Sequence, residues 1–240
     1  MEISIDTKSQ FVAFVAIFTA LAVVLDSIPI VPGFYSGVWD SWLFLISPLL
    51  GILLGPVVGA VSTLLGSFIG HLIYFRDPFE LIFMFGAQLG AFSAGMVYRY
   101  QWKPVLVMYS GLLLGYFLTP VSWQLSLWGI WDVVVGFIVI LVGSLFTRSG
   151  RWPLNDTQTV GLRLILATII GLETDILLRI FILVPCQAYW IFYGFTVEQL
   201  QILWLGAGFI TPLKVLMATL VGTSIGLYLK KVFGKTIQLD

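Results

Sequence analysis

The sequence contains few charged residues. Of its 240 residues, 10% are charged and 59% are hydrophobic, whereas about 25% of the residues in soluble domains are charged. A soluble chain of this length needs a polar surface, and so few charges cannot cover one. No Ser-rich, Gly/Ser-rich or acidic linker marks a second domain. The composition excludes an ordinary soluble protein and predicts a single integral membrane domain over residues 1–240.

Cysteine, histidine and the common catalytic motifs are also scarce. Cys186 is the single cysteine, which excludes an internal disulfide and a cysteine-rich metal site. His71 is the single histidine, which excludes a two-histidine metal site or haem ligation, and we expect it to be a polar residue at the membrane interface. Walker, zinc-ligand, nucleophile-elbow and Rossmann patterns are missing. We therefore predict no enzymatic activity, no cofactor and no ATP use by the chain itself.

Long apolar runs dominate what is present. A helix that spans a membrane needs about 20 predominantly apolar residues. The run at 41–55 is short for a span, contains Pro48 and ends at Gly55-Pro56, where the chain must turn. The pattern predicts an all-α, polytopic transmembrane helix bundle of six to eight helices. The apolar runs are 9–27, 41–55, 56–75, 80–99, 103–122, 128–147, 160–184 and 203–230.

The basic residues indicate the orientation of these helices. If the N-terminus is inside the cell, Arg76 is the one basic residue in the outer loops, and Arg163 lies just inside the run 160–184. This is the bias that the positive-inside rule describes. We expect a multi-pass protein of the cell membrane with both termini cytoplasmic. The basic residues of the inner loops are Lys8, Arg99, Lys103, Arg148, Arg151, Lys230, Lys231 and Lys235.

Tryptophan is concentrated at the outer side of this topology. Only Trp102 and Trp152 fall at the inner side, although aromatic belts normally occupy both interfaces. A belt explains part of the bias, and the excess favours an outer cavity that binds a flat ring by stacking or cation–π contact. The outer set is Trp39, Trp42, Trp123, Trp128, Trp131, Trp190 and Trp204, together with Tyr35, Tyr189 and Tyr193.

Acidic residues also gather near the outer ends of the runs. They either reflect the shortage of basic residues there or create a field that disfavours anions and tolerates cations or neutral ligands. The sequence leaves both explanations open. These residues are Asp26, Asp40, Asp77, Glu80, Asp132 and Glu198.

Four ionisable residues fall at membrane depth, where charge is costly and normally faces the bundle interior or a wet cavity. Asp175 and Arg179 have the spacing of an (i, i+4) pair on one helix face. Glu173 and Asp175 point about 200° apart on a helix, so they cannot share one partner. Lys214 should lie at similar depth on the neighbouring helix. Either structural pairing or ligand or proton binding explains such residues.

Small residues recur at helical spacing, as in Gly66/Gly70 and Gly222/Gly226. Such stripes let helix backbones approach closely in lipid, and we expect most of them to serve packing within the chain.

Three features follow one another in the N-terminal part of the sequence. Ala13, Ala16 and Ala20 give the first run a face of small residues, and a Pro- and aromatic-rich outer segment follows at 28–39. A short helix and the sequence GPVVGA at 55–60 come next. Together these features resemble the substrate-binding S components of energy-coupling factor vitamin transporters. The resemblance covers residues 9–99 well and 160–231 loosely. The family usually has six helices, so 103–147 corresponds to an extra helical hairpin.

The resemblance implies a subunit that captures a small micronutrient, such as a ring-containing vitamin, in an outer-facing pocket. It implies docking through Ala16 and Ala20 onto a membrane coupling subunit that carries two cytoplasmic ATPases, with no nucleic-acid partner. The aromatic and charged residues above supply the candidate substrate-binding set: Tyr35, Trp39, Trp42, Trp128, Trp131, Asp132, Glu173 and Arg179.

Two other classes of function remain open. The first is a membrane enzyme that acts on a lipid or isoprenoid, with Asp132, Glu173 and Asp175 as candidate carboxylates, although the sequence has no Asp-rich or paired-His motif. The second is a structural membrane protein of the cell-shape machinery, which can have a similar helix pattern. Absence of a ligand pocket would favour the second.

Overall fold

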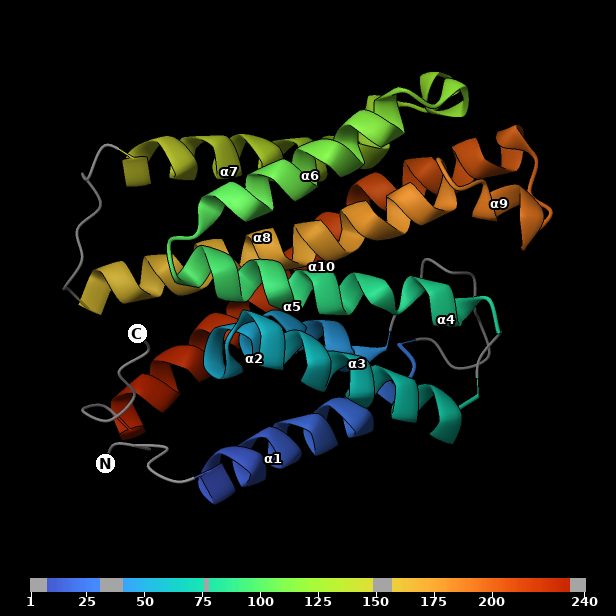
Figure 1. Cartoon of the computed structure of the whole chain (residues 1–240). Coiled ribbons are helices and arrows are strands. Elements are labelled where there is room, and N and C mark those ends of the chain that lie inside the picture. The colour runs from blue at the N-terminus through green and yellow to red at the C-terminus, as the bar shows by residue number, and fades with distance from the viewer. Residues whose placement is uncertain (1–7, 31–40, 76–77, 149–156, 234–240) are drawn as a thin grey trace.

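A computed structural model describes residues 8–30, 41–75, 78–148 and 157–233. These residues are helical almost throughout and form no strand, apart from one isolated antiparallel bridge between Pro29 and Ser41. The all-α prediction is therefore confirmed (Figure 1). The helices are α1 (Lys8–Asp26), α2 (Ser47–Leu54), α3 (Pro56–Ile73), α4 (Glu80–Phe83), α5 (Phe85–Tyr98), α6 (Trp102–Phe117), α7 (Trp131–Arg148), α8 (Thr157–Leu183), α9 (Ala188–Ile191) and α10 (Val197–Phe233), with 3₁₀ turns η1 (Trp42–Leu45), η2 (Pro120–Gln124) and η3 (Leu127–Ile130).

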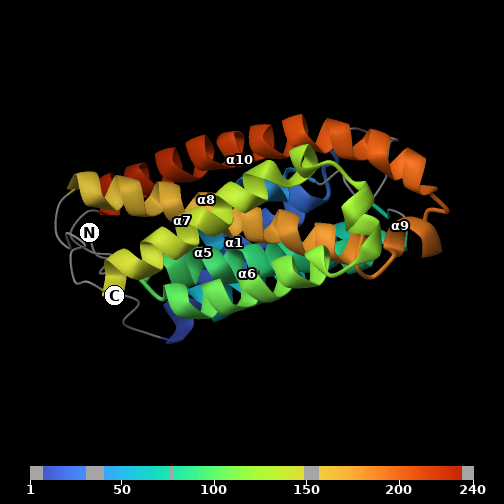
Figure 2. The same ribbon diagram turned by 90° about the horizontal axis from the view of Figure 1, so that it is seen from above.

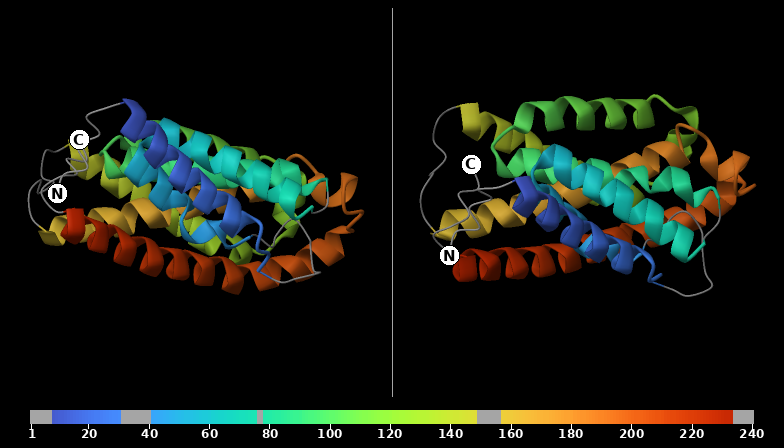
Figure 3. Two further views of the ribbon diagram at one scale, coloured as in Figure 1. Left: turned by 90° about the horizontal axis from the view of Figure 1, so that it is seen from below. Right: turned by 60° about the horizontal axis from the view of Figure 1, so that its bottom comes forward.

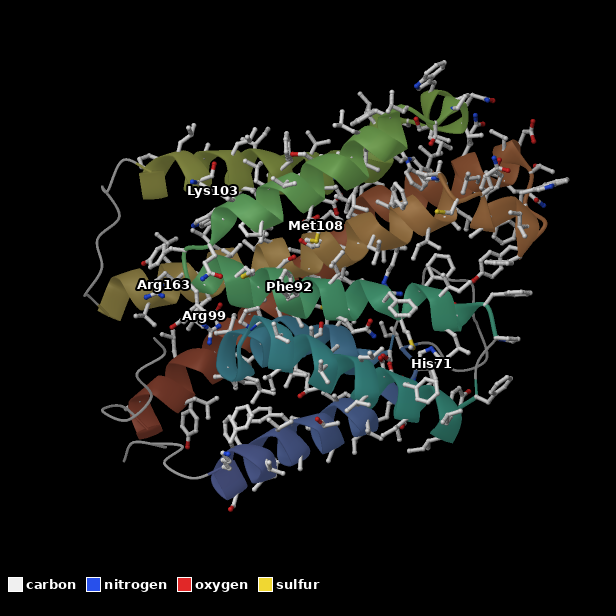
Figure 4. The ribbon with its side chains drawn as sticks, viewed as in Figure 1. His71, Phe92, Arg99, Lys103, Met108 and Arg163 are labelled. Carbon is white, nitrogen blue, oxygen red and sulfur yellow. The ribbon has the colours of Figure 1, made fainter. Side chains whose placement is uncertain are left out.

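The helices run alternately up and down one elongated bundle. Helix α1 begins and α10 ends at the same end of the bundle, on the left in Figure 1. Figure 4 places Arg99, Lys103 and Arg163 at this end, which we call the basic end. The opposite end, which contains the α3–α4 and α8–α9 connections, is called the distal end.

In the described part of the chain, four helical segments are long and apolar enough to cross a bilayer, which indicates a membrane protein. They are Pro56–Ile73, Glu80–Tyr98, Leu127–Phe146 and Val197–Leu229, and the shorter Phe11–Asp26 is also apolar. The run 41–55 forms only η1 and the eight-residue α2. A helix of that length extends about 12 Å, far less than the hydrocarbon core of about 30 Å. Helix α2 is buried in the bundle instead of forming a full span.

Helix α8 lies at the centre of the bundle. It packs against α2, α5, α6, α7 and α10, and α10 runs beside it along one side of the molecule (Figure 2). Helices α5 and α8 approach closely because glycines lie at their contact. A Cβ at Gly90 would lie 2.6 Å from the carbonyl oxygen of Gly171, and Gly171 in turn faces Ala94. In lipid, small residues of this kind stabilise helix pairs through direct backbone contact.

Glycines also hold the short helix α2 between α3 and α5. A Cβ at Gly51 would overlap the carbonyl oxygen of Ala91, and a Cβ at Gly59 would lie 2.5 Å from the Cα of Gly51. The chain turns from α2 into α3 at Gly55, whose φ of 92° is a conformation that side chains disfavour. Pro56 then begins α3. At this first position of a helix a backbone N–H has no partner within the helix, so a proline there costs no hydrogen bond. The Gly55-Pro56 signal thus marks a tight turn.

A proline in α10 exposes a carbonyl that another helix uses. Pro212 lies inside α10 and has no N–H to donate to the carbonyl of Gly208. The indole Nε1 of Trp131 donates to that oxygen at 2.9 Å. Within a bilayer such a freed backbone group needs a partner, and Trp131 supplies it while joining α7 to α10.

At the basic end, Arg163 of α8 caps helix α5. Its Nη2 donates to the carbonyl oxygen of Tyr98 at 2.5 Å. Its guanidinium carbon lies 4.5 Å from the ring centroid of Tyr98 and 4.4 Å from that of Tyr100. A cation at a helix C-terminus stabilises the last carbonyls, so Arg163 has a structural role in addition to its place in the basic bias.

Candidate solute-binding site

The C-terminal end of α1 meets α3 at two glycines. A Cβ at Gly66 would overlap the side chain of Ala22, and a Cβ at Gly70 would lie 2.6 Å from Oδ2 of Asp26. Because these two positions have no side chain, Asp26 can enter the bundle, and only 2% of its surface is exposed. The stripe Gly66/Gly70 therefore packs against α1, as expected for small residues in a bundle.

Asp26 is the centre of a buried polar network at the distal end. The hydroxyl of Ser41 donates to its Oδ1 at 2.6 Å. The Nδ1 of His71 lies 2.9 Å from its Oδ2 and 2.9 Å from the carbonyl oxygen of Ser67. Because both neighbours are acceptors, Nδ1 carries the hydrogen. The amide of Gln88 extends the network by donating to Oγ of Ser67 at 3.2 Å.

His71 is buried in this network and is 6% exposed. The sequence led us to expect an interfacial residue, and the structure places it inside the bundle instead. Figure 4 shows it in the half of the molecule opposite Arg99 and Arg163. The spacing Ser67/His71 puts both groups on the α3 face that receives Asp26.

Beside this network is a small cavity of about 20 Å³, which we call the acidic cavity. Its wall includes four residues of the network, Asp26, Ser41, Ser67 and His71, and three further charged side chains, those of Glu80, Asp175 and Arg179. The nonpolar part of the wall includes Phe44 and Met84. The described wall thus combines three carboxylates with one guanidinium and one imidazole, contributed by α1, α3, α4 and α8.

Asp175 and Arg179 form an ion pair on α8. The Nε of Arg179 donates to Oδ1 of Asp175 at 2.6 Å, and the two side chains are 15% and 2% exposed. This confirms the (i, i+4) pairing inferred from their spacing. A Cβ at Gly86 of α5 would overlap the Asp175 carboxylate, so this glycine makes room for the pair.

A second cavity of about 60 Å³ lies between α8 and α10, and we call it the apolar cavity. Arg179 borders it as well, and Thr211 and Lys214 are its other polar residues. The Nζ of Lys214 is 5.7 Å from the ring centroid of Phe44, which borders the acidic cavity. The remaining wall includes Phe83, Ile176, Ile180, Leu183, Leu203 and Trp204.

The predicted aromatic residues occupy several places. Trp128 and Trp131 stack on each other with centroids 6.1 Å apart, beside Phe209 of α10, and neither borders the acidic or the apolar cavity. Trp42 stacks on Phe44 at 6.1 Å. Tyr35 and Trp39 lie outside the described residues. That these aromatics bind a solute stays a prediction.

The predicted carboxylates have separate neighbours. Asp132 accepts a hydrogen bond of 2.5 Å from Thr211, which borders the apolar cavity. Glu173 is 3% exposed and lies against Gly136 and Tyr109, on the side of α8 away from Asp175. Its Oε2 has no hydrogen-bond partner among the described residues. Among those residues no group of three or more His, Cys, Asp or Glu is arranged to hold a metal ion.

Sequence reasoning did not include Asp26, His71, Glu80 or Asp175 in the candidate binding set. Asp26 and His71 are 45 residues apart, and only the contact between α1 and α3 brings them together. The stripe Gly66/Gly70 was a usable signal, because it marks the helix face on which His71 follows.

Ala16 and Ala20 lie on an exposed face of α1. They border an open groove between α1 and α3, at the edge of the bundle where these two helices run side by side (Figure 3). Thr19, Val58 and Leu65 also border it. The glycines of the stripes Gly66/Gly70 and Gly222/Gly226 instead contact neighbouring helices.

Comparison with models of protein families, with curated proteins and with solved structures finds no match to this chain.

Proposed function

We propose that this protein is a membrane-embedded subunit that captures a small solute at the outer face of the cell membrane for uptake driven by partner ATPases. The observation that carries the proposal is the acidic cavity, where α1, α3, α4 and α8 contribute ionisable side chains. Such groups are costly at membrane depth and commonly mark substrate pathways. The apolar cavity beside it adds a surface suited to a ring-containing micronutrient.

The proposal orients the basic end toward the cytoplasm. Arg99, Lys103 and Arg163 lie there, and the helices alternate in direction from α1 to α10 (Figures 1 and 4). In this topology η1–α2 returns the chain from Ser41 beside Asp26 to Gly55 beside Arg99, the passes number six to eight, and the cavities face outward.

Reporter fusions at Lys8 and at Asp240 test this topology. Because the positive-inside rule retains basic segments on the cytoplasmic side, a reporter active only in the cytoplasm should be active at both positions. Activity at one position only, or at neither, contradicts the proposed orientation.

In this proposal, a partner protein supplies the energy for uptake. The sequence has no nucleotide-binding motif, whereas the groove beside Ala16 and Ala20 offers small residues on an exposed helix face. A helix of a membrane coupling subunit that carries two cytoplasmic ATPases would pack there.

Mass spectrometry of small molecules released from the purified protein tests solute capture directly. We expect one solute to co-purify with the wild-type chain and its amount to fall at least about tenfold in Asp26→Asn, because the amide lacks the charge that Ser41 and His71 stabilise. Glu198→Gln is the matched control, since Glu198 is exposed on α10 and borders neither cavity.

Size-exclusion elution of each variant shows whether it is folded. Equal solute content in folded Asp26→Asn places the binding site elsewhere. Solute capture is refuted if no solute co-purifies and deletion of the gene does not change uptake. That result favours a structural membrane protein.

A further inference from the structure

The acidic and apolar cavities are separated largely by side chains. Arg179 borders both. Phe44 on the acidic side meets Lys214 on the apolar side, with 5.7 Å between Nζ and the ring centroid. The consecutive residues Phe83 and Met84 face the apolar and the acidic cavity respectively. On the α8 side, Arg179 is therefore a side chain that the two spaces share.

Neither cavity alone holds a vitamin-sized molecule. A volume of about 20 Å³ holds one water, since a single water occupies on the order of 10–15 Å³ on this scale. The apolar cavity, at about 60 Å³, has room for roughly four such positions, which approaches the size of one six-membered ring. A larger ligand needs both spaces.

The chemistry of the two walls differs. Asp26, Glu80 and Asp175 place three carboxylates on the acidic side, where a positive group is favoured. The apolar side presents Phe83, Ile180 and Trp204, which suit a flat apolar body. A molecule that extends across Arg179 would thus be cationic at one end and ring-like at the other.

We propose that the solute is an amine-bearing ring compound whose ammonium group replaces the guanidinium of Arg179 on Asp175, while its ring occupies the apolar cavity. This inference rests on the proposed function and names its substrate class. Removing one partner from a buried ion pair is strongly unfavourable, so only another cation can take the place of Arg179. Glu80 borders the same cavity and offers a second carboxylate to the displaced guanidinium.

Binding of four small probes to the purified protein, measured by calorimetry, tests the class. The probes are 2-phenylethylamine, 3-phenylpropionate, 2-phenylethanol and butylamine, which separate charge from ring. We expect 2-phenylethylamine to bind at least about tenfold more tightly than each of the others, because only it satisfies both walls.

Two variants test the role of the ion pair. Asp175→Asn should weaken binding of 2-phenylethylamine by at least about tenfold, because the carboxylate that receives the ammonium is lost. Arg179→Met should bind 2-phenylethylamine more tightly than the wild type, since no guanidinium must be displaced. 2-Phenylethylamine should also raise the melting temperature of Arg179→Met more than it raises that of the wild type. Glu198→Gln should behave like the wild type.

Several results overturn the inference. Tighter or equal binding of 3-phenylpropionate refutes the cationic end, equal binding of butylamine refutes the ring site, and weaker binding to Arg179→Met refutes the exchange. Binding of none of the probes refutes the class. A co-purified solute without an amine refutes this inference but still supports solute capture. The proposed function itself is refuted only if no solute co-purifies and gene deletion does not change uptake.

Discussion

Replacing Ala20 by Trp is expected to abolish solute uptake and co-purification of the coupling subunits, while solute binding by the isolated chain is retained. Ala20 and Ala16 border the exposed groove between α1 and α3. Close approach of a partner helix in lipid depends on such small residues, and an indole would hold the partner away. The two cavities lie elsewhere in the bundle, so binding should be unaffected.

Ala13→Trp is the matched control. Ala13 is also exposed on α1 but does not border the groove. We expect normal uptake in this variant and loss of uptake in both Ala16→Trp and Ala20→Trp. Normal uptake in all three variants ends the docking proposal, and joint loss of folding and binding would return Ala16 and Ala20 to a role within the bundle.

The largest loss of stability is expected for Gly51→Ala. The new methyl group would overlap the backbone oxygen of Ala91, and Gly51 also lies against Gly59 and Gly95. Backbone atoms of three packed helices cannot move aside as the end of a flexible side chain can. We expect a cost of about 3 kcal/mol or more from overpacking, seen as a lower melting temperature and poor recovery of the detergent-purified protein.

Gly111→Ala is the corresponding control in α6. Position 111 is exposed, and no other helix in the described part of the chain comes within 4 Å of its Cβ position. Alanine favours a helix over glycine by about 1 kcal/mol, so this variant should be as stable as the wild type or more so. A stable Gly51→Ala protein would show that α2 does not contact α5 and α3 through its backbone.

The class of the protein and its local pairings could be predicted from the sequence. Scarcity of charge and long apolar runs identify membrane helices, because a span must satisfy its backbone internally and present apolar side chains to lipid. The pair of Asp175 and Arg179 was also predictable, because helix geometry alone brings residues i and i+4 together. So was the separation of Glu173 from Asp175.

The length of an apolar run did not predict the length of the helix where contacts between helices determine the structure. The run 41–55 is apolar enough to be read as a span, but its helix has eight residues and is buried among α3, α5 and α8. Gly51 allows this burial. Apolar composition is the same whether a segment faces lipid or protein, so composition cannot separate the two.

Only the tertiary structure decided which residues form the candidate site. Asp26 and His71 meet across 45 residues because Gly70 admits the end of α1, and the same fold places Trp204 at the apolar cavity and Trp131 on the carbonyl freed by Pro212. The sequence shows that small, polar and aromatic residues are present and how they are spaced along each helix. Which faces meet depends on packing between helices distant in sequence, and this is a property of the whole bundle that local spacing does not encode.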